Sequence, residues 1–152
     1  MANTQAVCNS FKTDLFNGLH AFGASVIRAA TTKDSFKAAL YLATATVNKS
    51  TTAYSVTNEV SGTNYTAGGV AITNANAPAN TADVTYWTPS ASFAWTTVTL
   101  ATAFDCCLIY NVTAAGANSV ASYTFSSQTV TAGNFTLTMP TNDQTTGLLR
   151  LT

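Results

Sequence analysis

The side chains that could perform catalysis are few and widely separated in this sequence. His20 is the single histidine, so a Ser–His–Asp or Cys–His site would have to be built around it. No signature such as G-x-S-x-G is present, and His20 lies just beyond the end of a predicted helix. A surface or helix-terminal histidine is the simpler interpretation, and we predict no catalytic residues.

The carboxylates are also too dispersed to indicate a site. They are Asp14, Asp34, Glu59, Asp83, Asp105 and Asp143. Two of them could meet in space as a glycosidase pair, but acidic residues in turns usually cap or solvate chain ends. The loop aspartates do not have calcium-loop spacing, and a chain with one histidine and no C-x-x-C pair is a poor zinc ligand. We therefore predict a non-enzymatic protein that binds no metal and no cofactor.

The composition limits the partners that this chain can bind. Charged residues make up 8% of the sequence and the net charge is zero, whereas ordinary soluble domains contain about 25% charged residues. The six cations form no cluster, which disfavours nucleic-acid binding, and no apolar run reaches the ~20 residues of a membrane span. Surfaces with so little charge repel one another only weakly, so we expect the protein to pack against copies of itself or another protein.

The compartment is predicted from the cysteines and the N-terminus. Residues 1–14 lack the basic and apolar regions of a signal peptide. Cys8, Cys106 and Cys107 are an odd set, and neighbours on a strand point to opposite faces. These features favour synthesis in a reducing cytoplasm over a disulfide-linked scaffold.

One helix is predicted, over residues 4–17. Asn3 can cap its start and Gly18 can end it, and apolar residues recur at three- and four-residue spacing. That stripe consists of Val7, Cys8, Phe11, Leu15 and Leu19. The helix either lies over the sheet of its own domain or is an arm that docks on a neighbouring subunit through Phe11 and Leu15.

From residue 35 the pattern changes to period two and predicts strands. Eight strand-like runs are separated by breakers such as "NANAPAN", "TAAGAN" and "PTNDQTTG". We predict an all-β fold, an antiparallel β-sandwich of jelly-roll type, with an immunoglobulin-like sandwich as the alternative. Residues 1–152 form one domain, with a helix or arm over 1–20 and the sandwich over 35–152.

Two runs allow finer predictions. "CCLIY" (106–110) is continuously apolar and should be a central strand with both faces covered. In "SFAWTTVTL", strict alternation would place Phe93 and Trp95 on one face of the sheet, and Ala94, Val98 and Leu100 on the other.

The middle of the chain carries a more specific pattern. Three runs resemble a family of small structural proteins of tailed bacteriophages: "KAALYLATATVNKSTTAYSVTNEVSGTNYTAGGVAITN" (37–74), "WTTVTLATAFDCCLIYN" (95–111) and "TFSSQTVTAGNFTLTMPTNDQTTGLLRL" (124–151). The matching positions are Lys37, Leu40 and Tyr41; Thr52, Ala53, Tyr54, Thr57, Glu59, Val60, Gly62, Tyr65, Ala67, Gly68 and Gly69; Ile109, Tyr110 and Asn111; and Thr138, Pro140 and Asp143. The cysteine pair at 106 and 107 departs from the family, in which small apolar residues are more usual.

The resemblance implies a non-enzymatic virion protein. Our leading hypothesis is a capsid decoration, or cement, protein on the capsid exterior, which binds the major capsid protein and copies of itself; a trimer would suit three-fold positions. The alternative is a tail, fibre or baseplate module that binds host glycans through exposed aromatic rings. Those rings would be Tyr41, Tyr54, Tyr65, Tyr86, Trp87 and Trp95.

Within the cement hypothesis, the candidate residues are structural or interfacial. Glu59 is expected to anchor backbone amides in the turn that ends at Gly62, and Tyr65 to cover a sheet edge. Gly68 and Gly69 are expected to permit a bulge or the close approach of another backbone. The full set is Glu59, Gly62, Tyr65, Gly68, Gly69, Tyr54, Phe11 and Leu15.

Overall fold

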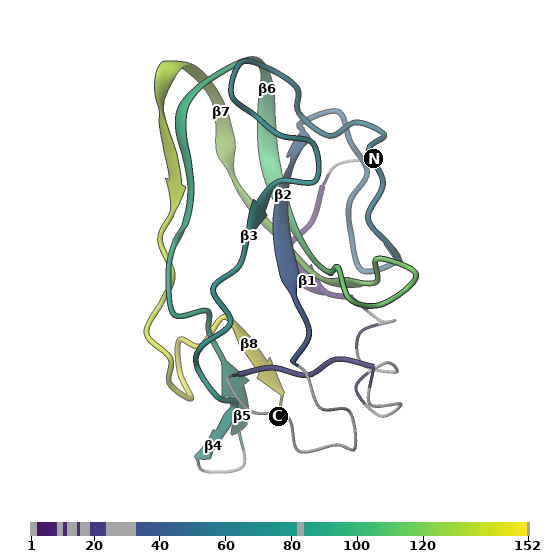
Figure 1. The fold of residues 1–152 in the computed structure, drawn as a ribbon, viewed down its shortest axis with the longest axis vertical. Coiled ribbons are helices and arrows are strands. Elements are labelled where there is room, and N and C mark those ends of the chain that lie inside the picture. The colour runs from purple at the N-terminus through teal and green to yellow at the C-terminus, as the bar shows by residue number, and fades with distance from the viewer. Residues whose placement is uncertain are drawn as a thin grey trace.

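The computed structural model describes residues 3–8, 11, 15, 19–23, 33–81 and 84–151. The strands of this part are β1 (Ala6–Val7), β2 (Phe36–Leu42), β3 (Val70–Ala71), β4 (Ala79–Thr81), β5 (Val84–Trp87), β6 (Phe93–Asn111), β7 (Ser119–Leu137) and β8 (Leu149–Leu151). They form two antiparallel sheets, of order β1-β7-β6-β2-β3 and β4-β5-β8 (Figure 1). The predicted all-β, antiparallel class is confirmed.

The frame of the larger sheet is a hairpin of two 19-residue strands, β6 and β7. Their pairing runs from Phe93 opposite Leu137 to Tyr110 opposite Ser119. The turn is held by the side chain of Asn111, whose Oδ1 accepts hydrogen bonds from the backbone N–H groups of Thr113 and Ala114 at 2.9 and 3.0 Å. An Asn side chain that bonds the backbone two or three residues ahead is a common way to reverse the chain.

The run Cys106–Tyr110 is buried on both faces, as predicted. It lies in β6 between β7 and β2, and none of its residues is more than 4% exposed. Cys107 and Ile109 point into the larger core, whereas Cys106, Leu108 and Tyr110 point into a smaller core on the other face. The three cysteines are buried free thiols.

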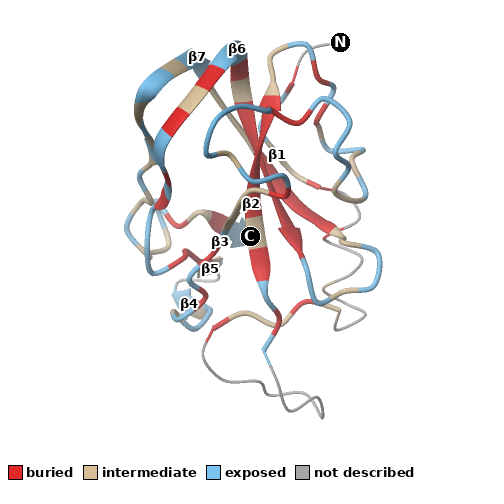
Figure 2. Ribbon diagram, turned by 45° about the horizontal axis from the view of Figure 1, so that its top comes forward, coloured by how far each residue is buried: buried red, intermediate tan, exposed pale blue. Residues whose placement is uncertain are grey.

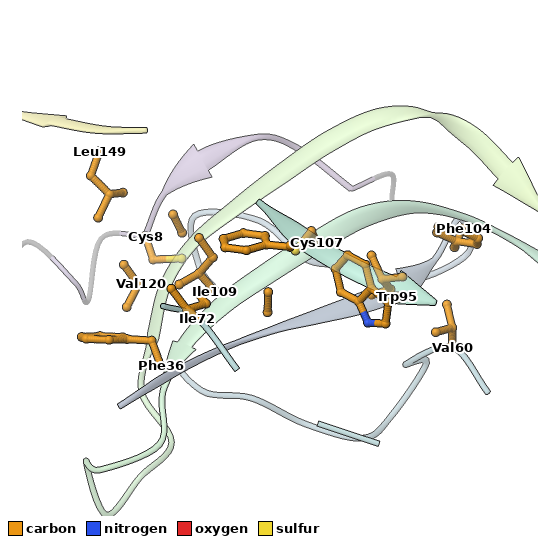
Figure 3. Close-up of a cluster of buried hydrophobic side chains, with 14 of the residues drawn as sticks. Cys8, Phe36, Val60, Ile72, Trp95, Phe104, Cys107, Ile109, Val120 and Leu149 are labelled. Atoms are coloured by element: carbon orange, nitrogen blue, oxygen red, sulfur yellow. The ribbon is translucent and has the colours of Figure 1, made fainter. Parts of the chain in front are cut away.

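The larger core takes side chains from both sheets. Phe36, Ile109 and Val120 come from the five-stranded sheet, and Trp87 and Leu149 come from β5 and β8. Figure 3 shows Phe36, Ile109, Val120 and Leu149 gathered in this core. Phe22 joins the two groups, because its ring stacks on Phe36 with centroids 4.8 Å apart and lies 4.6 Å from Trp87.

The predicted faces of the run 92–100 are wrong in part. Ala94 is exposed while Phe93 and Trp95 are buried, which agrees with the predicted opposite faces, but Val98 and Leu100 are buried in the same core as Phe93 and Trp95. The cause is an irregularity between Trp95 and Val98, where Thr97 adopts φ 53° and the register shifts. An extra residue in a strand reverses which face the following side chains occupy.

The helix predicted over residues 4–17 is not seen. Ala6 and Val7 instead form β1, opposite Ser122 and Ala121 of β7, and the Cys8 N–H donates to Val120 O at 3.2 Å. Tertiary pairing with β7 overrides the helical spacing, because local propensity is the weaker preference. Residues 9–10, 12–14 and 16–17 of that range lie outside the described part.

Phe11 and Leu15, the proposed docking residues, pack against the chain's own core. Phe11 is 2% exposed, and Leu15 is half-buried beside the same cluster. These two residues therefore pack within their own domain. Phe11 is not accessible to a neighbouring subunit, and Leu15 is only partly exposed.

Candidate functional site

Residues 43–58 cross the outer face of β2 and β6 and cover the smaller core, and residues 59–69 continue along the edge of β2, where Val60 and Tyr65 pack with the larger core. Tyr54 packs on this core, whose buried members include Val47 and Leu108. The segment is fastened to the sheet along its length by backbone hydrogen bonds from Tyr54 N to Ala117 O (2.9 Å), Val60 N to Leu40 O (3.0 Å) and Thr63 N to Thr99 O (3.1 Å). The sheet is therefore covered on this face by a loop without regular strands.

Glu59 is the centre of this segment. It is 7% exposed. Its Oε2 accepts a hydrogen bond from the Tyr54 hydroxyl at 2.6 Å, and its Oε1 accepts bonds from the Tyr65 hydroxyl at 2.7 Å and the Gly68 N–H at 2.8 Å. Hydrogen bonds to a charged acceptor are shorter and about twice as strong as neutral ones. The carboxylate thus holds both halves of the segment. The backbone amide that it binds is that of Gly68, beyond the turn ending at Gly62 in which the sequence predicted such a bond.

Two tyrosines extend this network to the sheet. The Tyr65 hydroxyl also accepts from the Leu40 N–H at 3.0 Å, at a point of β2 beyond the two residues that pair with β3. The Tyr110 hydroxyl donates to Gly68 O at 2.8 Å, and its ring stacks on Tyr54 with centroids 4.5 Å apart. Tyr65 therefore takes the place of a strand residue along the edge of β2.

The glycines let this segment approach the sheet more closely than any other residue could. Gly69 has φ 72°, and a Cβ built on it would lie 1.8 Å from Ala38 O. A Cβ on Gly62 would lie 2.0 Å from Thr99 O. Gly68, at φ 89°, leaves room for the Tyr110 hydroxyl. The close backbone approach expected at Gly68 and Gly69 is present at Gly69.

The phenols of this cluster are held in the neutral form. Burial raises the pKa of Tyr110 to about 12, with a smaller contribution from the negative charge of Glu59. Burial also raises the pKa of Tyr41, Tyr54 and Tyr65, and for the last two the hydrogen bond to Glu59 adds to the effect. Each hydroxyl is committed to an internal partner, so this chemistry fastens chain segments together.

Sequence reasoning did not identify Tyr41 and Tyr110 as members of this cluster. Tyr41 is 3% exposed and its hydroxyl donates to Ser55 O at 2.5 Å. Trp87 and Trp95 are equally buried, while Tyr54, Tyr65 and Tyr86 are half-buried. Half of the six rings considered for a sugar-binding face therefore lie in the interior. The signals in the sequence were their places in predicted strands and in the motifs that resemble the phage family.

A second polar cluster joins His20 to the other end of β6. The Asn111 Nδ2 lies 3.0 Å from His20 Nδ1 and donates to Asp34 Oδ2 at 2.9 Å. Asp34 Oδ2 also accepts from the Ala21 N–H at 2.9 Å, and the Phe11 ring packs 4.9 Å from the His20 ring. His20 is therefore buried, which corrects the prediction of a surface position. The buried amide links three distant segments, a structural role that no local motif indicates.

The described residues offer no preformed metal site and no membrane span. Among them, no group of three His, Cys, Asp or Glu side chains is placed to hold a metal ion. No helix in the same residues is long and apolar enough to cross a membrane. Comparison of the chain with protein-family models, curated proteins and solved structures gave no match.

Replacing Glu59 with Gln should destabilise the protein. Gln keeps one acceptor oxygen where the carboxylate has two, so the three donors cannot all be satisfied. We expect the free energy of unfolding to fall by about 1.5–3 kcal/mol, the range for hydrogen bonds to charged groups. Urea denaturation of Glu59→Gln, Tyr65→Phe and the double variant measures the coupling. Strictly additive losses would show that Glu59 and Tyr65 do not act together.

Gly69→Ala should be more damaging than its single methyl group suggests. The added Cβ meets Ala38 O at 1.8 Å and the backbone is left-handed, so we expect a loss of roughly 3 kcal/mol or more. Gly133→Ala is the matched control, because its Cβ would make only ordinary contacts, with Val130 Cγ1 at 3.4 Å and Thr131 O at 3.6 Å. Equal midpoints of urea denaturation for the two variants would contradict the close approach.

Stability should fall steeply at alkaline pH. The phenol pKa values are raised above the ordinary value of 10 in the folded state, so the folded protein retains protons that the unfolded chain releases. The stabilisation is complete below pH 10 and is lost as pH rises toward 12 and beyond. Tyrosinate absorbance and circular dichroism, followed together, should change in one transition. Ionisation of Tyr110 near pH 10 with the fold intact would contradict this.

Proposed function

We propose that this chain is a non-enzymatic structural protein of a tailed-phage particle. It is a capsid decoration, or cement, protein that binds the assembled shell of major capsid protein from outside and stabilises it. In this proposal the two sheets act as a rigid sandwich of jelly-roll type, and many copies, grouped as trimers at three-fold positions, occupy equivalent sites on the shell. The motifs in residues 37–74 and 138–143 suggest the phage family, and the surface described next supports adhesion.

The observation that carries the proposal is a large surface almost without charge. Among residues 84–142, which the structure describes throughout, Asp105 is the one charged residue. Its Oδ1 accepts a hydrogen bond from Asn3 Nδ2 at 2.6 Å. The far half of the β6–β7 hairpin is nevertheless well exposed on β7 (Figure 2). Its exposed side chains there include Ser126, Ser127, Gln128, Thr129 and Thr131.

A neutral hydroxyl- and amide-bearing surface is well suited to being covered. Removing a charge from water costs several kcal/mol unless a partner compensates it, whereas a hydroxyl loses far less and can regain a hydrogen bond. Long-range repulsion between neighbouring copies is also small, which allows a dense symmetric array. A protein that binds only the assembled shell stabilises it by mass action.

The internal network supports the same role. A cement protein must transmit force between capsid subunits, and Glu59 and its donors fasten the covering segment to the central strands without leaving polar groups free for catalysis. The burial of Tyr41, Trp87 and Trp95 weakens the glycan-binding alternative, because stacking on sugars needs accessible rings.

Copy number in purified particles tests the proposal directly. Quantitative mass spectrometry against the major capsid protein should find on the order of hundreds of copies, as expected for a protein repeated over a symmetric shell. A count on the order of ten would instead place the chain in the tail and refute the cement function.

A charge placed on the neutral surface should block loading. Thr129→Lys adds a cation on exposed β7, and we expect it to weaken binding to particles stripped of the protein by about tenfold or more. Ser50→Lys, at an exposed turn over the opposite face of the sheet, is the control and should bind normally. Both variants should unfold at the wild-type urea concentration. Normal loading of Thr129→Lys would remove the hairpin from the interface.

A further inference from the structure

An open groove of about 750 Å³ lies between the open edge of β1 and the C-terminal loop. Gln5, Ala6 and Val7 form one wall, and residues 144–148 form the other. The Tyr123 hydroxyl, which also lines the groove, donates to Leu148 O at 2.8 Å and ties the loop to β7. Volumes of this size are typical of sites that bind ligands.

The β1 wall offers backbone groups that another strand could use. β1 is the terminal strand of its sheet, and the Cys8 N–H points toward β7, where it donates to Val120 O. Backbone groups alternate in direction along an antiparallel strand, so those of Val7 and Gln5 point toward the groove. Within the described part of the chain, neither residue forms a backbone–backbone hydrogen bond on that side. An unpaired edge of this kind accepts an added strand.

The opposite wall is rigid and presents an unused acceptor. Asp143 Oδ1 accepts hydrogen bonds from Thr145 N, Thr145 Oγ1 and Thr146 N, each at 2.7 Å, which fixes the loop. Gln144 lines the groove, and its Oε1 is shielded from solvent without a hydrogen-bond partner among the described residues. A buried polar atom that lacks a partner is costly, and a donor from a bound chain would relieve that cost.

Among the described residues that line the groove, Arg150 is the one with a charged side chain. Its guanidinium donates to Thr145 O, which uses one of five N–H donors and holds the side chain in place. The remaining donors match a carboxylate in geometry and charge. A ligand that fills the groove should therefore carry an acidic group at this end.

We propose that this groove binds an extended segment of another protein, which adds as a strand to the open edge of β1 and places a carboxylate against Arg150. The inference goes beyond the proposed function, because it specifies how a partner chain is held whatever protein supplies it. If the chain decorates a shell, a shell subunit supplies the segment.

The described carboxylates of this chain are already engaged, so none of them is well placed to supply the acidic group from a second copy. Glu59 and Asp34 are buried in hydrogen-bonded clusters. Asp105 is bonded to Asn3, and Asp143 is held within its own turn. Complementary charge thus favours a different protein as the occupant.

Short acidic peptides test the inference with the isolated protein. The probes are acetylated, amidated peptides of alternating Thr and Val, about eight residues long, the usual span of a strand. One Asp replaces each residue in turn, and Asn at the same place gives the control peptides. We expect at least one Asp peptide to shift the backbone amide resonances of residues 5–7 and 144–148. Its Asn counterpart should bind about tenfold more weakly.

Two pairs of variants separate the edge from the charge. Val7→Pro removes an N–H that the β1–β7 ladder does not use, and Val7→Ala keeps it. Arg150→Met removes the cation from the groove, and Lys49→Met removes one from an exposed turn. We expect Val7→Pro and Arg150→Met each to weaken peptide binding by about tenfold, while their controls bind as the wild type does.

Three results would overturn the inference. One is equal binding of Asp and Asn peptides, and another is a set of shifted resonances outside the groove. The third is concentration-dependent dimerisation that shifts the same resonances without peptide, which would identify a second copy as the occupant. No particle is needed, so failure of shell binding and failure of this inference are distinguishable.

Discussion

One buried carboxylate, that of Glu59, holds the segment that covers the outer face of the larger sheet. Glu59 receives two phenol hydroxyls and a backbone N–H, and each donor belongs to a different part of residues 53–69. The Tyr65 hydroxyl extends the network to Leu40 of β2, and the Tyr110 hydroxyl of β6 joins it by donating to Gly68 O. Without that acceptor, the segment over the smaller core would leave several polar groups buried and unpaired, which is costly in a low-dielectric interior. Burial of β6 on both of its faces therefore depends on Glu59.

The same arrangement explains why a protein with so little charge can be rigid. Two of its carboxylates, those of Glu59 and Asp34, are buried in internal hydrogen-bonded clusters, where each bond is strengthened by exclusion of water. The exposed half of the β6–β7 hairpin is left with hydroxyl and amide groups. In the proposed function, stability would thus depend on the internal clusters and adhesion on the exposed hairpin.

Much of the strand content could be predicted because apolar continuity and period-two alternation can be recognised in short runs of sequence. Continuous apolar character placed Cys106–Tyr110 in the centre, and alternation located β2 and the run 92–100, but the sequence did not show that β6 joins the runs 92–100 and 106–110 in one 19-residue strand. The prediction failed where pairing overrode local pattern. Residues 6 and 7 lie in a run with helical spacing, but they pair with β7 as a strand. The irregularity at Thr97 shifts the register, so that Val98 and Leu100 point into the core. Neither effect is encoded in a short window of sequence.

The sequence by itself determined the all-β class, the central strand, the neutral surface and the positions that require glycine near Gly69. These follow from properties of single residues and short runs: charge, β-branching, apolar continuity and the absence of a Cβ. Only the tertiary structure decided that Glu59 binds Tyr54 and Tyr65, that Asn111 joins His20 to Asp34, and that β1 leaves an open edge beside Arg150. Such contacts join residues far apart in the chain, and their geometry exists only after the strands have paired.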